Sequence, residues 1–68
     1  MLDRTVVILR LPDVKLRTGL SRSTIYSRMS EGAFPRPIPL GGRSVGWLEP
    51  EVRDWIAHKL ELRRMRAL

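Results

Sequence analysis

The densest group of side chains able to do chemistry lies between Gly19 and Gly32. Hydroxyl groups and guanidinium groups alternate there. The members are Ser21, Arg22, Ser23, Thr24, Ser27 and Arg28. Hydroxyls can hydrogen-bond phosphate oxygens, and the planar fork of an arginine suits both phosphate and the O6 and N7 atoms of guanine. This combination indicates binding to a nucleic acid.

Enzyme chemistry finds little support in the same sequence. There is one histidine, His58, and no cysteine, so no cluster with metal-ligand spacing exists. The seven carboxylates are scattered, and Gly41-Gly42 lacks the pattern of a phosphate-binding loop. A chain of 68 residues has little room for a water-excluding pocket. We therefore expect no catalytic residues, no metal, no cofactor and no small-molecule substrate.

The charge of the chain agrees with a polyanionic partner. Thirteen Lys and Arg residues, eleven of them Arg, against seven Asp and Glu give a net charge of +6. The alternative is a basic surface that serves only solubility. No apolar run approaches the roughly 18 residues of a membrane span, and the lack of cysteine gives no hint of secretion. These features predict an intracellular protein without a membrane partner.

Two short helices must position the hydroxyl and arginine group. Residues 11–18 read as a helix because Pro12 suits a first turn and Gly19 supplies a stop. Residues 21–31 read as a second helix, with Ser21 as its N-cap and Gly32 just past its end. Its inward stripe is Ile25 and Met29. On that basis Ser23, Ser27 and Ser30 point outward, with Thr24 and Arg28 on one flank.

The segment that follows is extended and ends in a hairpin. Prolines at 35, 37 and 39 exclude a helix, and Pro39 requires an edge strand. Gly41-Gly42 marks a turn inside a hairpin over 38–47, whose tip carries Arg43 and Ser44. Residues 1–9 form an N-terminal arm, whose segment 6–9 either adds a strand to a sheet edge or packs over the core.

Residues 49–66 read as a third helix. Its inward stripe is Val52, Trp55, Ile56 and Leu60. Trp47 and Trp55 could stack on bases, but their spacing favours core packing. The basic end over 61–68 has three possible roles: it grips phosphates, binds another protein chain, or frays in solvent.

The whole pattern predicts one domain over 1–68, mostly α with a small β-hairpin, arranged as a winged helix-turn-helix. The hairpin is then the wing, which lies over the DNA backbone or places Arg43 in the minor groove. The alternatives are an ordinary helical hairpin with a polar outer face and a plain β-turn with a solvated arginine. The predicted DNA-binding residues are Ser21, Arg22, Ser23, Thr24, Tyr26, Ser27, Arg28, Arg36, Arg43 and Ser44.

An ordered series of motifs over roughly residues 8–60 resembles the AlpA family. The motifs are Leu11-Pro12-Asp13-Val14, the run 18–26, Gly32-Ala33-Phe34-Pro35-Arg36-Pro37, Leu40-Gly41-Gly42-Arg43, Val45-Gly46-Trp47, Glu51-Val52 and Trp55-Ile56. This family comprises small prophage-type regulators similar to excisionases and to the winged-helix part of MerR regulators. Pro39 and Pro50 depart from the family pattern, and Pro39 puts a phosphate contact from its strand in doubt.

The resemblance implies sequence-specific binding to double-stranded DNA in the cytoplasm of a bacterium, at the nucleoid. It implies that the second helix is the recognition helix and that Arg43 belongs to the wing. The role we favour is excision, as a recombination directionality factor of an integrated mobile element, together with or instead of regulation of its genes. Such proteins self-associate along DNA, and an integrase is a further possible partner. The alternatives are a transcriptional activator of an integrase gene with no direct part in excision, and a protein-interaction module that contacts an integrase.

Overall fold

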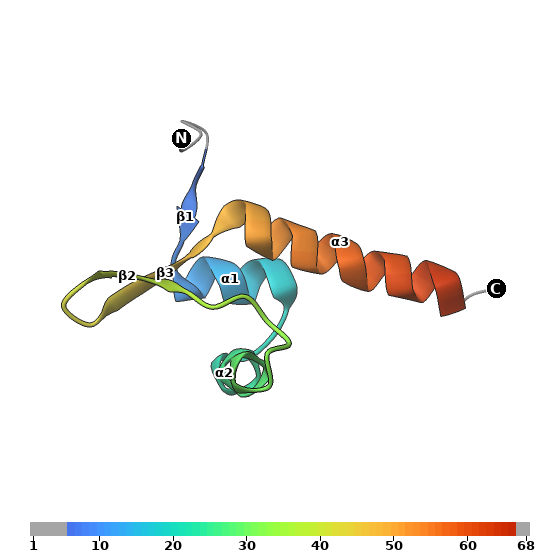
Figure 1. The fold of residues 1–68 in the computed structure, drawn as a ribbon, viewed down its shortest axis with the longest axis horizontal. Coiled ribbons are helices and arrows are strands. Elements are labelled where there is room, and N and C mark those ends of the chain that lie inside the picture. Colours follow the sequence, from blue (N-terminus) through green and yellow to red (C-terminus); the bar gives the residue numbers. More distant parts are fainter. Residues whose placement is uncertain (1–5, 67–68) are drawn as a thin grey trace.

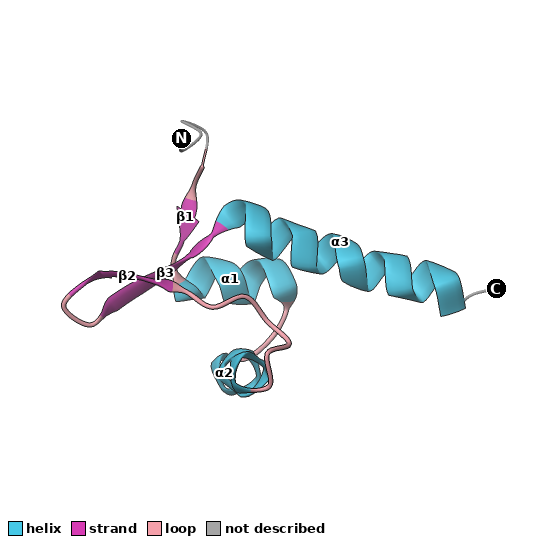
Figure 2. Ribbon diagram, in the orientation of Figure 1, coloured by secondary structure: helices cyan, strands magenta, loops and turns pink. Residues whose placement is uncertain are grey.

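The computed structural model describes residues 6–66, and the parts of the expected arm and basic end at 1–5 and 67–68 lie outside them. Three helices and three strands follow one another in the order β1 (Ile8–Leu9), α1 (Leu11–Thr18), α2 (Arg22–Ser30), β2 (Ile38–Gly41), β3 (Ser44–Leu48) and α3 (Glu49–Arg66). Figures 1 and 2 show the β2–β3 hairpin extending to one side of the helices. The predicted class, mostly α with a small hairpin and compatible with a winged helix-turn-helix, is confirmed.

The sheet is antiparallel and has the order β1-β3-β2, so both outer strands are short edge strands. Leu9 pairs with Trp47 across β1 and β3, and its side chain is 3% exposed. The edge-strand alternative for segment 6–9 is therefore realised by Ile8–Leu9, and the core-packing alternative by Leu9, whereas Val7 and Ile8 are exposed. Pro39 lies in β2 opposite Val45, in the edge position that its missing N–H requires.

A small apolar core joins the three helices to β1 and β3, whereas β2 contributes no buried side chain. Its buried members are Leu9, Val14, Ile25, Phe34, Trp47 and Val52. Trp47 is fully buried and Trp55 packs against the cluster, so the core interpretation of both tryptophans is confirmed. Since so small a domain buries a modest fraction of its surface, each of these side chains is a large part of the stabilising burial.

One helix prediction is wrong at a single position. Leu60 was expected on the inward stripe of α3 but is 52% exposed, whereas Val52 is 1% exposed. Figure 1 shows the reason: α3 runs past the other elements, so its last turns have no layer of the described chain beneath them. Periodicity identifies the apolar face of a helix, but the length of the neighbouring elements decides how much of that face is covered.

No helix within residues 6–66 combines the length and the apolar character that crossing a membrane requires.

Candidate nucleic-acid interface

The start of α2 is held by its own hydroxyl side chains. The Ser21 Oγ atom accepts a hydrogen bond from the backbone N–H of Thr24 over 3.2 Å, as expected of an N-cap. The same hydroxyl donates to Thr24 Oγ1 over 2.9 Å and lies 3.2 Å from Ser23 Oγ. These three predicted contacts therefore form one small network at the amino end of the helix, where the helix dipole favours anions.

The outer face of α2 is as polar as expected. Ile25 is completely buried, and Ser23, Ser27 and Ser30 are exposed on the other side of the helix. Ser30 Oγ donates back to the Ser27 carbonyl oxygen over 2.7 Å, so its hydroxyl proton is already used. Small side chains along this ridge allow another molecule to approach the helix backbone closely.

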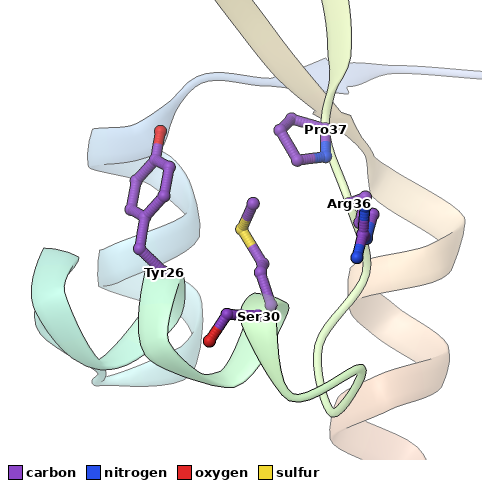
Figure 3. Close-up of a pocket in the computed structure, with 5 residues that line it drawn as sticks. Tyr26, Ser30, Arg36 and Pro37 are labelled. Atoms are coloured by element: carbon purple, nitrogen blue, oxygen red, sulfur yellow. The ribbon is translucent and has the colours of Figure 1, made fainter.

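On the flank of α2 that faces the sheet, Tyr26 contacts Arg22 and borders a hollow that Arg36 also lines. The Arg22 guanidinium carbon lies 5.0 Å from the centre of the Tyr26 ring, in cation–π geometry. The Tyr26 ring also meets Trp47 edge-on, with ring centres 6.3 Å apart. Figure 3 shows a hollow of about 430 Å³ bounded by Tyr26, Ser30, Arg36 and Pro37. The structure thus brings Arg36, from the extended segment, next to the residues of α2.

On the opposite flank lies a second hollow of about 480 Å³, lined by Ser23, Thr24, Ser27, Arg28 and Glu31. Arg28 contributes to this lining, while its Nε atom is buried and has no hydrogen-bond partner within residues 6–66. Glu31 was not among the predicted site residues. The signal that could have found it is its spacing of four from Ser27, which places both on one side of the helix.

The wing residues lie apart from the α2 group. Arg43 and Ser44 are exposed at the tip of the hairpin, where Gly41 and Gly42 have φ angles of +114° and +56°. Positive φ values of this kind favour glycine and allow the tight turn. Figure 1 shows the tip projecting away from α2, so the ten predicted residues form two patches.

Ion pairs separate the arginines into two groups. Arg17 and Arg53 pair with Glu49, and Arg64 pairs with Glu61. Within residues 6–66, none of the predicted DNA-contacting arginines takes part in an ion pair. Their charge is thus available to an external anion. That these residues contact DNA stays a prediction.

The wing is also held by a contact that the sequence analysis did not foresee. Arg10, just before α1, donates from Nε to the Val45 carbonyl oxygen over 3.0 Å and so ties β3 to the start of α1.

The sequence comparisons agree with the motifs. The model of the family "Prophage CP4-57 regulatory protein (AlpA)" matches residues 7–60. The DNA-binding transcriptional activator AlpA of Escherichia coli strain K12 is 39% identical over 69 aligned positions, covering 91% of this chain and 99% of that protein. The uncharacterized protein ORF88 of Enterobacteria phage P4 is 46% identical over 56 residues, or 82% of this chain; the chain matches 64% of the length of that phage protein. The chain therefore belongs to the AlpA family of prophage regulatory proteins.

Proposed function

We propose that this chain binds double-stranded DNA in a sequence-specific manner, with α2 in the major groove and the hairpin tip at the adjacent backbone or minor groove. The observation that carries the proposal is the outer face of α2. It presents small hydroxyl side chains between arginines that form no ion pair within residues 6–66. An α-helix with its side chains is about 10–12 Å across, and the major groove is about 12 Å wide. The E. coli relative is named as a DNA-binding protein, which also supports the proposal.

A salt titration tests this function. The affinity for duplex DNA, measured by fluorescence anisotropy, should fall with salt, with a slope near −0.9 for each phosphate neutralised. Arg22→Ala and Arg43→Ala should each weaken binding and reduce the magnitude of the salt slope by about 0.9, the value for one phosphate contact. Arg53→Ala is the matched control because Arg53 is paired with Glu49 on α3. A flat salt slope, or an unchanged affinity for DNA in both Arg22→Ala and Arg43→Ala, would overturn the proposal.

For the biological role we propose a recombination directionality factor that steers excision of an integrated element, regulates its genes, or does both. The name of the E. coli relative supports regulation, and activation of an integrase gene alone is the alternative. Footprinting on DNA around the gene of this protein and the nearest integrase attachment site distinguishes the two roles. Several sites in phase at the attachment site would support excision, whereas one promoter-proximal site would support regulation alone.

A protein partner is the second candidate function, favoured by the exposed end of α3. Leu60 and Met65 are 52% and 63% exposed there and alternate with basic residues. We propose that this face serves self-association along DNA or contact with an integrase. Leu60→Ser with Met65→Ser should reduce cooperative binding to DNA with several sites or capture of the integrase, while leaving binding to a single site unchanged. Unchanged cooperativity together with unchanged capture would contradict it.

A further inference from the structure

The two flanks of α2 carry different charges. At 100° per residue, Thr24 and Arg28 lie on one side of the helix and Tyr26 on the other. Among residues 6–66, the hollow on the Tyr26 side is lined by Arg36 and by no carboxylate, whereas the hollow on the Arg28 side is also lined by Glu31. An anion such as a phosphate therefore meets only positive or neutral groups on the first side, and meets a negative charge on the second.

Arg28 has a donor that nothing in the described chain satisfies. Its Nε atom is buried without a hydrogen-bond partner, and within residues 6–66 its side chain makes no ion pair with Glu31 or any other acid. A shielded charged donor without an acceptor is costly, so native proteins rarely keep one unless a ligand or water satisfies it. The hollow that Arg28 lines also carries the small hydroxyl side chains of Ser23, Thr24 and Ser27, so a flat ligand edge can approach the guanidinium group. The buried Nε atom would meet that edge only once the side chain turns toward the ligand.

The ligand must offer acceptors to Arg28 and, beside them, a donor to Glu31. A phosphate offers acceptors alone and is repelled by the carboxylate. In the major groove, a G·C pair presents the O6 and N7 acceptors of guanine next to the N4 amino donor of cytosine. We infer that this hollow reads one G·C base pair, with Arg28 donating to the guanine and Glu31 accepting from the cytosine amino group. The inference rests on the proposed function and adds to it the base that this site selects.

The experiment compares the base preference of the wild type with that of one variant. Duplexes are selected from a random library by the wild-type chain and by Arg28→Gln. The wild-type sites should share an invariant G·C pair. The Arg28→Gln sites should carry A·T at that position, because glutamine hydrogen-bonds adenine N6 and N7. Replacing the selected guanine by 7-deazaguanine, which lacks the N7 acceptor, should weaken wild-type binding roughly 10-fold and leave Arg28→Gln unchanged.

Two further variants separate readout from charge. Arg22→Gln, on the other flank, should weaken all sequences alike and keep the wild-type base preference. Glu31→Gln should raise the affinity for random DNA and lower the ratio of specific to random binding, while Glu51→Gln on α3 changes neither. Thermal unfolding by circular dichroism shows whether each variant folds, since the replaced side chains lie on the helix surface or its flank.

The outcomes that overturn the inference differ from those that overturn DNA binding. Uniform weakening in Arg28→Gln, with a salt slope smaller by about 0.9, would make Arg28 a phosphate contact and reject the reading of a base pair. An unchanged G·C preference in Arg28→Gln would also reject it. In both cases the proposed DNA binding stands. Only a wild-type chain that shows no salt-dependent affinity for any duplex would reject both together.

Discussion

The indole nitrogen of Trp55 on α3 donates a 2.8 Å hydrogen bond to the carbonyl oxygen of Ala33, three residues past the end of α2. Trp47 of β3 likewise donates to the carbonyl oxygen of Pro35, two residues after Ala33, over 3.0 Å. Phe34, between the two acceptors, is buried against the edge of Trp55, with ring centres 4.9 Å apart. The two tryptophans thus hold the segment that joins α2 to the wing and fix the position of one patch relative to the other.

The C-terminal cap of α2 sets the direction of this segment. Gly32 has a φ angle of +73°, and the N–H groups of Gly32 and Ala33 donate to the carbonyl oxygens of Met29 and Arg28. This is the Schellman motif, which closes a helix and turns the chain sharply. The carbonyl group of Ala33 consequently lies where Trp55 can reach it.

Trp55→Phe should destabilise the protein and weaken binding to DNA. The variant keeps an aromatic ring against Phe34 but removes the only N–H donor of the side chain. Loss of one such hydrogen bond costs about 0.5–1.5 kcal/mol, and the smaller ring adds to this. Thermal unfolding should show a decrease of several degrees in the melting temperature. If the clamp positions the wing, affinity should decrease even at temperatures where the variant is fully folded. Wild-type affinity under those conditions would show that the hydrogen bond serves stability alone.

Gly46→Ala should be destabilising for a reason that only the fold reveals. Gly46 is buried in the central strand, and a Cβ atom there would overlap Ile8 Cγ2 and lie 3.0 Å from Leu40 Cδ1. Ile8 is β-branched and has few rotamers, so relieving the overlap requires a less favourable Ile8 rotamer or a shift of β1. Overpacking of this kind typically costs about 1–3 kcal/mol. Chemical denaturation measures it, with Ser44→Ala on the same strand as the control. Equal midpoints for the two variants would contradict the close packing over Gly46.

Local signals in the sequence accounted for most of the elements, because each has a local cause. Pro12, Ser21, Gly19 and Gly32 mark helix ends by their own backbone chemistry, and the structure begins and ends α1 and α2 at these signals. The prolines and the glycine pair likewise predicted the hairpin. Tertiary relationships were harder to predict. The packing of Ile8 and Leu40 over Gly46 and the hydrogen bond from Arg10 to Val45 produce no periodic pattern in the sequence, so neither could be predicted from it.

The candidate site shows the same division. Helical periodicity correctly placed the serine ridge of α2 outward. It did not single out Glu31, because acidic residues near helix ends are common and their meaning depends on what lies beside them. Nor did it show that Arg36 lines the same hollow as Tyr26, since that depends on the path of an extended segment.

Ser21→Ala should lower stability by about 1 kcal/mol, since it removes the N-cap of α2. That loss corresponds to a decrease of about 4–8 °C in the melting temperature of a domain of this size. Ser27→Ala is the control, because Ser27 is exposed in the middle of the helix, where alanine has the higher helix propensity. Circular dichroism melts should therefore separate the two variants. Equal melting temperatures would mean that the Thr24 N–H is satisfied as well by water.

Val52 and Leu60 lie on the same apolar face of α3, two turns apart, and test how far the core extends along this helix. Val52→Ala removes two methyl groups from a fully packed site and should cost about 2 kcal/mol. Leu60→Ala removes more apolar surface but from a side chain that is 52% exposed, so its cost should stay within about 0.5 kcal/mol. Urea denaturation of the monomer at low concentration measures both changes. A cost for Leu60→Ala as large as that for Val52→Ala would mean that the end of α3 is covered in solution. A cost that grows with protein concentration would identify a second copy of the chain as the cover, because only association depends on concentration.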